Sequence, residues 1–259
     1  MVAVNVFEHL TLVLLVLSLA GVHANVLEEK EQHKQQEPPE QKGDEAGELS
    51  DECSHARVDR CARTLVPYSV NETLPIDEAE IDAFCNEQKS DLRCFEAFEK
   101  GQCVHGITMA VFRAAREGTT DEIESRCIKG SPRREDYAKY TACINTVGGK
   151  LTQCSQRMLR VFAAASVHTS KKERIPYGCC HFDAYLACVK GVVKAACSPE
   201  HVEYAETLVH NMSGNVLSLA CGGYSHRASA CKRLRKLPPV NSEHATFIGA
   251  LLETFAPLG

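Results

Sequence analysis

The sequence of 259 residues has no tryptophan and only four methionines, and aromatic residues make up 6% of it. Long alternating runs of β-branched residues are also missing, which argues against a β-sheet. There is no Cys-x-x-Cys pair, His-x-His unit or His-Glu-x-x-His motif, so no zinc-binding pattern is present. We therefore expect no β-fold, no metal ligands and no cofactor, although histidines from separate helices leave metal sequestration as an alternative.

Catalytic motifs are equally missing. The chain lacks a Gly-x-Ser-x-Gly elbow, a glycine-rich loop for phosphate and a Cys-Gly-x-Cys-Trp nucleophile motif. The acidic clusters at residues 77–82 and 121–124 are typical of helix starts, where carboxylates stabilise the positive end of the helix dipole. The sequence therefore favours a protein that is not an enzyme and has no catalytic residues.

Negative charge is concentrated near the N-terminus. The formal net charge of the chain is −5, and the acidic segment 25–50 accounts for most of this excess. Residues 51–259 are nearly neutral, which argues against binding to nucleic acid or to an anionic lipid surface. The segment 25–50 is rich in Glu, Gln and Lys and contains no aromatic residue, so it predicts a disordered acidic arm.

The first 24 residues have the features of a secretory signal peptide. The apolar run from Leu10 to Ala20 is shorter than the roughly 20 residues that span a bilayer. The segment 22–24 then places small residues at the cleavage positions. We therefore expect residues 1–24 to be removed and the mature protein to be secreted without a membrane span.

Cysteine, in contrast, is abundant: the chain has 14 cysteines, all after residue 52. Because secretion brings the chain into an oxidising compartment and the number is even, we expect every cysteine to form a disulfide. The cysteines are Cys53, Cys61, Cys85, Cys94, Cys103, Cys127, Cys143, Cys154, Cys179, Cys180, Cys188, Cys197, Cys221 and Cys231.

Eight of these cysteines repeat one spacing. The intervals are 9, 9 and 24 residues in the series that starts at Cys85 and again in the series that starts at Cys179, and the offset between the series is 94 residues. The repetition predicts two related cysteine-framed units, residues 51–157 and 158–259. The adjacent Cys179 and Cys180 should bond to different partners, since a bridge between neighbours is strained.

The intervals also predict how these cysteines lie. Nine residues advance a helix by about two and a half turns, so Cys85 and Cys94 should face opposite sides of one helix. An interval of 24 residues fits a helical hairpin with a turn near Gly118, and it favours a bridge from Cys103 to Cys127. By the same argument we expect a bridge from Cys197 to Cys221 in the second unit.

Apolar residues after position 50 follow helical periodicity. Ile107, Ala110, Val111 and Ala114 share one helix face, and the apolar segment 245–259 predicts a C-terminal helix that docks on the rest. The predicted fold is therefore all-α, a disulfide-stapled helical bundle built from two related cysteine-framed repeats.

Two N-glycosylation sequons follow from the secreted context. They begin at Asn71 and at Asn211, and we expect both asparagines to be modified on exposed turns.

A bundle pinned by disulfides can hold an apolar cavity open, although the same periodicity is expected of an ordinary core. The candidate lining residues are Met109, Val111, Phe112, Met158, Val161, Phe162, Val209 and Leu217.

The second unit carries a resemblance to a known family. The stretch from Tyr177 to Cys188 (YGCCHFDAYLAC), followed by Cys197, a helix over 204–212 and Cys221, resembles the arthropod 27 kDa hemolymph proteins, a secreted cysteine-rich family of unknown function. The first unit shares the cysteine frame but has Phe84 before Cys85 where that family would have a Cys-Cys pair. The resemblance implies an extracellular glycoprotein of the hemolymph type and brings no catalytic residues.

These patterns together predict a secreted, non-enzymatic binding protein that carries an apolar small ligand or binds an extracellular protein partner. A closed apolar pocket would favour the ligand, and an exposed apolar patch would favour the partner. A secreted defence protein that sequesters metal or acts on microbial surfaces is the alternative.

Overall fold

The computed structural model describes residues 53–101, 103, 105–214, 221, 224, 228–241 and 246–255. Within these residues the regular structure is helical throughout, which confirms the all-α prediction. The segments expected to be a signal peptide and an acidic arm, 1–24 and 25–50, lie outside the described residues. All described residues belong to one unit, Glu48–Gly259.

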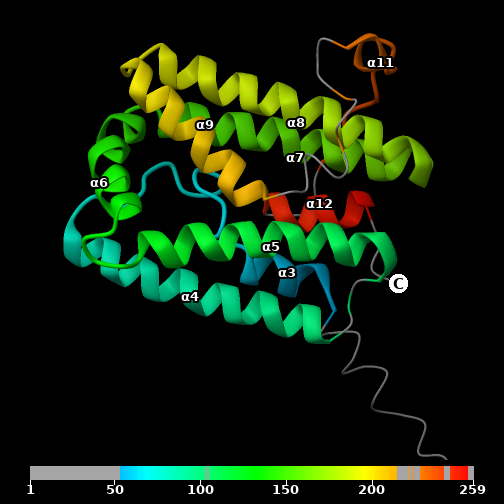
Figure 1. The fold of residues 1–259 in the computed structure, drawn as a ribbon. Helices are drawn as coiled ribbons and strands as arrows, with labels where there is room; N and C mark the ends of the chain where they lie inside the picture. The colour runs from blue at the N-terminus through cyan, green and yellow to red at the C-terminus, as the bar shows by residue number, and fades with distance from the viewer. Residues whose placement is uncertain are drawn as a thin grey trace, which may run out of the picture. The chain divides into compact units, whose positions relative to one another are not determined.

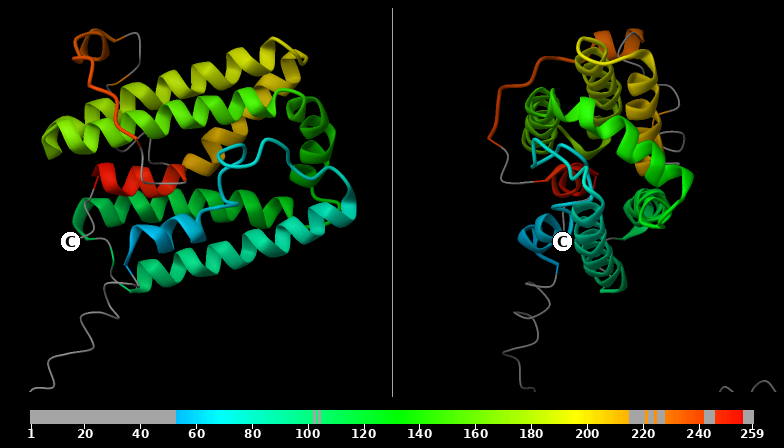
Figure 2. Two further views of the ribbon diagram at one scale, coloured as in Figure 1. Left: turned by 180° about the vertical axis from the view of Figure 1, so that it is seen from behind. Right: turned by 90° about the vertical axis from the view of Figure 1, so that its left-hand side faces the viewer.

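The helices form two layers (Figures 1 and 2). In one layer α4 packs against α3 and α5, and in the other α8 packs against α7 and α9. Helix α12 lies between the layers and contacts α3, α5, α7 and α8, while α9 also packs along α5. The helices are α3 (His55–Cys61), α4 (Glu78–Lys100), α5 (Gly106–Arg126), α6 (Pro132–Asn145), α7 (Gly148–His168), α8 (Lys171–Lys194), α9 (Pro199–Ser213), α11 (Ser229–Lys232) and α12 (Phe247–Phe255).

Local sequence explains where several helices begin. The Asp77 carboxylate accepts hydrogen bonds from backbone N–H groups in the first turn of α4, so the acidic cluster 77–82 does mark a helix start. Pro132 and Pro199 take the first positions of α6 and α9, where the missing N–H would have no partner in the helix. The expected C-terminal helix is present as α12, with Leu252 buried.

The turn expected near Gly118 is absent, and this prediction is wrong. Gly118 lies inside α5, which continues without a break to Arg126, so the acidic residues 121–124 belong to the later turns of a helix and not to a start. A Cβ on Gly118 would lie 2.4 Å from the backbone oxygen of Asn211. Glycine is therefore required here because the end of α9 approaches the backbone of α5 closely.

All 14 cysteines form disulfides, as the even count and the secretory context predict. The adjacent Cys179 and Cys180 bond to different partners, as expected. The bridges are Cys53–Cys103, Cys61–Cys94, Cys85–Cys127, Cys143–Cys197, Cys154–Cys188, Cys179–Cys221 and Cys180–Cys231.

The two expected bridges Cys103–Cys127 and Cys197–Cys221 are wrong. Because α5 is one continuous helix of 21 residues, its ends lie about 30 Å apart, far beyond the reach of a disulfide. Cys103 instead bonds to Cys53, and Cys197 bonds to Cys143.

The predicted two-sided attachment of α4 is confirmed. Cys85 bonds to Cys127 at the end of α5, whereas Cys94 bonds to Cys61 of α3. Because the two cysteines face opposite sides of α4, the helix is fixed covalently to neighbours on both flanks.

The seven bridges fall into two groups along the chain. Three bridges lie within residues 53–127 and four within 143–231, so no disulfide joins the two groups. Three bridges of the first group have counterparts of similar sequence separation in the second. The pairs are Cys85–Cys127 with Cys179–Cys221 (42 and 42 residues), Cys61–Cys94 with Cys154–Cys188 (33 and 34), and Cys53–Cys103 with Cys143–Cys197 (50 and 54). This repeated pattern is consistent with the two-unit interpretation, which stays a prediction. The expected boundary between residues 157 and 158 falls inside α7.

No described helix has both the length and the apolar character needed to cross a membrane.

Candidate functional site: an apolar cavity between the layers

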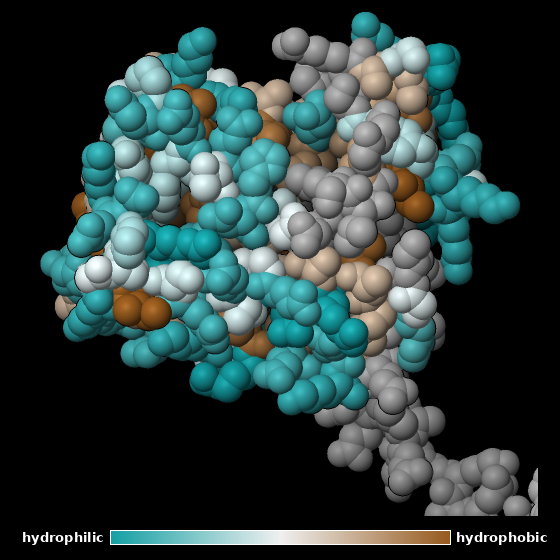
Figure 3. All heavy atoms as spheres, viewed as in Figure 1, coloured by the Kyte–Doolittle hydropathy of each residue, from teal (hydrophilic) through white to brown (hydrophobic). Residues whose placement is uncertain are grey.

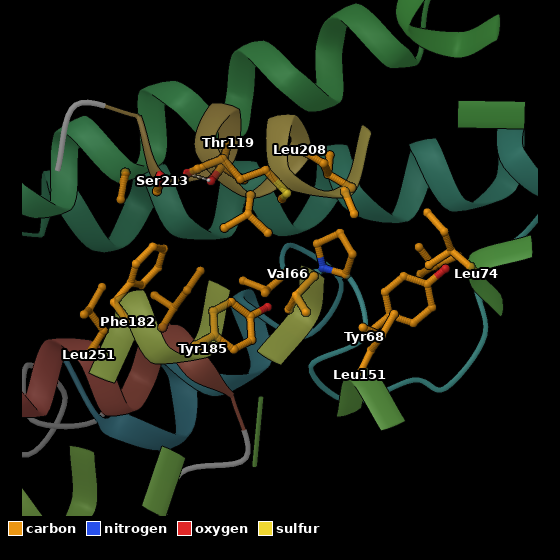
Figure 4. A pocket seen from close by; sticks show the side chains of 18 of the residues that line it. Val66, Tyr68, Leu74, Thr119, Leu151, Phe182, Tyr185, Leu208, Ser213 and Leu251 are labelled. Carbon is orange, nitrogen blue, oxygen red and sulfur yellow. Dashed lines mark hydrogen bonds between the residues drawn. The ribbon is translucent and has the colours of Figure 1, made fainter. Parts of the chain in front are cut away.

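An apolar cavity lies among α5, α6, α7, α8, α9, α12 and the segment 66–74 (Figure 4). Hydrocarbon dominates its lining, which suits it to an apolar molecule. The apolar lining residues are Val66, Pro67, Leu74, Val111, Ala115, Ile144, Leu151, Phe162, Phe182, Val189, Ala205, Leu208, Val209, Met212, Ile248 and Leu251, and four tyrosines join them: Tyr68, Tyr137, Tyr185 and Tyr204.

The cavity has a volume of about 130 Å³. Pockets for drug-sized ligands occupy roughly 300–1,000 Å³, so this cavity is smaller than such a pocket. An engineered apolar cavity of about 150 Å³ stays dry and binds benzene. The volume therefore fits a compact molecule of about the size of a single six-membered ring.

One end of the cavity is held by the side chain of Asn145 at the end of α6. Its Oδ1 accepts hydrogen bonds of 2.9 Å from the Tyr68 hydroxyl and from the backbone N–H of Leu74, and its Nδ2 donates 2.8 Å to the Leu74 carbonyl. Tyr68 has a φ of 54°, a left-handed conformation that is uncommon for a non-glycine residue. Asn145 thus fixes the segment that brings Tyr68 and Leu74 to the cavity, where Leu151 lies beside them (Figure 4).

The opposite end is formed by Phe182 of α8 and Leu251 of α12 (Figure 4). The Phe182 ring packs against Tyr185 with a centroid distance of 5.9 Å, and both rings join the apolar cluster around Met158 and Phe162 of α7. Helix α12 therefore completes the cavity wall from the C-terminal end of the chain.

Two of the lining tyrosines have buried hydroxyls that donate to no acceptor among the described residues. They are Tyr137 of α6, whose side chain is 1% exposed, and Tyr204 of α9. Burial raises the pKa of Tyr137 to about 12, and the charge of Arg126 and its hydrogen bond to the phenol oppose this effect. Burial also raises the pKa of Tyr204. Both phenols therefore stay protonated and can donate a hydrogen bond.

A buried polar network lies beside these tyrosines. The Arg126 guanidinium is 1% exposed and lies 4.8 Å above the centre of the Tyr137 ring. It donates to Gln88 Oε1 at 3.1 Å, and its Nε lies 4.0 Å from the Glu122 carboxylate. Gln88 in turn donates to the Thr64 carbonyl at 2.8 Å. Because Glu122 is buried with Arg126, the charge of the guanidinium is compensated inside the protein.

The sequence located only part of this cavity. Of the residues expected to line it, Val111, Phe162 and Val209 do so. Met109 and Phe112 instead join an apolar cluster on the far side of α5, where the Phe112 and Phe95 ring centroids are 4.4 Å apart. Met158 lies in the core cluster next to Phe162, Val161 is half-buried, and Leu217 lies outside the described residues.

The tyrosines and the segment 66–74 were missed by sequence reasoning. Tyr137 and Tyr204 lie in α6 and α9, where their spacing is that of any buried helix face. The breakers Pro67 and Pro75 were the available signal, since they mark an irregular segment whose apolar side chains must pack somewhere.

The two expected glycosylation sites lie in different surroundings. Asn71 is exposed in the segment before α4, whereas Asn211 is half-buried in the last turn of α9. Among the described residues, no group of three histidine, cysteine or acidic side chains is arranged to hold a metal ion.

Comparisons with known proteins add no identification, because no protein-family model, curated protein or solved structure matches the chain significantly.

Proposed function

We propose that this protein is a secreted, non-enzymatic carrier of a small apolar molecule. The observation that supports the proposal most directly is the apolar cavity of about 130 Å³ between the two helical layers. Apolar burial drives binding in such a site, because each Å² of apolar surface removed from water contributes about 25 cal/mol.

The disulfides support both the carrier role and secretion. A helix pair that closes onto an empty cavity would gain packing contacts, so an open cavity needs a frame that resists collapse. Cys154–Cys188 joins α7 to α8, and Cys143–Cys197 joins the end of α6 to the start of α9, so covalent bonds hold helices that line the cavity. Seven bridges also fit an oxidising compartment, in agreement with the predicted signal peptide.

The surface of the described residues gives less support to a protein partner. Their large exposed apolar side chains are Val70, Ile76, Ile128 and Val167, which lie before α4, after α5 and near the end of α7. The face in Figure 3 is mainly hydrophilic over its coloured area. A docking surface is instead expected to gather apolar side chains into one patch, so the cavity makes the carrier the favoured candidate.

The proposal can be tested with benzene as a probe of matching size. Methyl NMR spectra of the secreted protein should show benzene-dependent shifts at the lining residues Val111, Leu208 and Val209, while buried methyls elsewhere, such as those of Val58 and Leu65, stay unchanged. Native mass spectrometry of the same preparation should show an apolar molecule that is released on denaturation.

A matched pair of variants provides the control. Ala115 lines the cavity and Ala142 is exposed on α6. Ala115→Phe should place a ring in the cavity and abolish the benzene shifts, whereas Ala142→Phe should leave them intact. The carrier function is wrong if benzene shifts no lining methyl in a folded wild-type protein.

A further inference from the structure

The four cavity tyrosines differ in how their hydroxyls are used. Tyr68 donates to Asn145 Oδ1 at 2.9 Å, so its hydroxyl holds the fold together. The Tyr137 and Tyr204 hydroxyls, in contrast, are shielded from solvent and donate to no acceptor among the described residues. A buried donor without an acceptor destabilises a protein, and phenylalanine would fill the same space without this cost. The two hydroxyls are therefore expected to serve a molecule that occupies the cavity.

The surroundings of the two hydroxyls indicate what kind of group they would meet. Both rings lie in the same part of the core, and the phenol of Tyr68 is raised in pKa by burial and by both of them. The positive Arg126 guanidinium lies over the Tyr137 ring, and it lowers the pKa of Tyr204 against the effect of burial. The two phenol donors on one side of the cavity attract an electron-rich atom.

The same surroundings argue against an anion. Arg126 is already compensated by the buried Glu122 carboxylate, whose oxygen lies 4.0 Å from its Nε. A carboxylate in the cavity would therefore be a buried charge without a counterion, which is strongly unfavourable. A neutral oxygen is accommodated at much lower cost, because it needs only the two phenol donors.

We propose that Tyr137 and Tyr204 donate hydrogen bonds to one neutral acceptor oxygen, so that the cavity selects a compact carbonyl compound of about the size of a six-membered ring. This inference rests on the proposed carrier function. It adds that the ligand has one carbonyl oxygen and an otherwise apolar body, and that its orientation is fixed by the two hydroxyls.

The test compares two probes that differ by one oxygen, cyclohexanone and cyclohexane. Dissociation constants are measured by methyl NMR titration for the wild-type protein, for Tyr137→Phe, for Tyr204→Phe and for the double variant. Each hydroxyl removed should weaken cyclohexanone binding by about fivefold, and cyclohexane binding should stay equal or become tighter. The ratio of the two constants should thus change by more than tenfold in the double variant.

Tyr68→Phe is the matched control, because Tyr68 also lines the cavity but its hydroxyl bonds to Asn145. It should leave the ratio of the two dissociation constants unchanged and lower the thermal midpoint by about 2 to 4 °C. The ligand-free Tyr204→Phe protein should melt at the wild-type temperature or above it.

The outcomes separate the two proposals. If benzene fails to bind the folded wild-type protein, the carrier function is wrong. If cyclohexane binds but the ratio does not change in the double variant, the carbonyl preference is overturned and the carrier function stands. A lower melting temperature of ligand-free Tyr204→Phe, similar to that of Tyr68→Phe, would also overturn it, because that hydroxyl would then have a structural partner such as a buried water.

Discussion

The side-chain amide of Asn211 in α9 donates a hydrogen bond of 2.9 Å to the buried carboxylate of Glu122 in α5. Glu122 is 3% exposed, and its oxygens lie 3.5 Å from the Arg133 guanidinium and 4.0 Å from that of Arg126. Asn211 therefore holds α9 on α5 through an internal carboxylate. The amide nitrogen that makes this bond is also the atom that a glycan would occupy.

We accordingly expect a glycan at Asn71 and an unmodified amide at Asn211. Asn71 is exposed, whereas a glycan on Asn211 would break the bond to Glu122 and leave a buried carboxylate without one of its donors. Glycopeptide mass spectrometry of protein expressed through a eukaryotic secretory pathway measures both occupancies. Asn71→Gln should remove the glycan mass from the intact protein, and Asn211→Gln should leave that mass unchanged; a glycan on Asn211 of the folded protein would contradict this arrangement.

Replacing Gly118 or Gly191 by alanine should change the free energy of unfolding in opposite directions. In Gly118→Ala the new methyl would lie 2.4 Å from the Asn211 oxygen, so we expect a loss of about 1–3 kcal/mol in the free energy of unfolding. A Cβ on Gly191 of α8 would meet no other atom within 4 Å, and Gly191→Ala should stabilise the helix by about 0.5–1 kcal/mol. Denaturant unfolding monitored by circular dichroism measures both. Equal effects at the two positions would show that helix propensity, and not the approach of α9, decides the outcome.

The pairing of Cys127 can be read from a tryptic digest without reduction. Cleavage after Arg126 and Lys129 releases the tripeptide 127–129, and the sequence places Cys85 in the peptide 64–89. Because Cys127 bonds to Cys85, we expect these two peptides to remain linked after removal of any glycan. A link from 127–129 to the peptide 101–113, which contains Cys103, would instead support the hairpin pairing.

The cavity tyrosines should ionise later than ordinary tyrosines in an alkaline titration. Burial raises the pKa of Tyr137 to about 12 and raises that of Tyr204 and Tyr68, against about 10 for an unfolded tyrosine. The folded state therefore favours the protonated phenols, and their contribution to stability is complete below pH 10 and is lost as the pH rises towards 12.

Because the chain has no tryptophan, near-ultraviolet absorbance follows its seven tyrosines directly. We expect some phenols of the folded protein to ionise only when the protein unfolds at high pH, whereas all seven should titrate near pH 10 in guanidinium. Tyr137→Phe should remove one late-titrating phenol. Ionisation of all seven near pH 10, with an unchanged far-ultraviolet circular dichroism spectrum, would show that the cavity tyrosines are not buried.

Much of the fold follows from simple regularities in the sequence. The helical period places Cys85 and Cys94 on opposite faces of α4, and Asp77 and the two prolines mark helix starts by local chemistry. Pairings over longer distances do not follow, because an interval of 24 residues fits either a hairpin or a straight helix. Gly118 looks like a turn residue in the sequence, but it is a glycine because the backbone of α9, almost a hundred residues later, approaches it closely.

The cavity is harder to predict for a related reason. Periodicity shows which side of a helix turns inward, but it does not show whether two inward sides fill the space between them. Val111 faces the cavity, whereas Phe112, the next residue, packs into a filled cluster with Phe95. Segment 66–74 completes the wall through the bonds of Asn145, and no pattern in the sequence connects that asparagine with Tyr68 and Leu74.

Because of how the disulfides are grouped, the short exposed turn after α5 is the place where the two groups are joined by the backbone alone. Ile128 is 62% exposed and the Lys129 side chain 74%, and no bridge spans this turn. A single hydrolysed peptide bond after Lys129 would convert the protein into two separately cross-linked polypeptides. They would stay associated only through non-covalent contacts such as those between α5 and α9, and each would carry part of the cavity wall. Under the proposed carrier function, proteolysis there would release the carried molecule without reducing any disulfide.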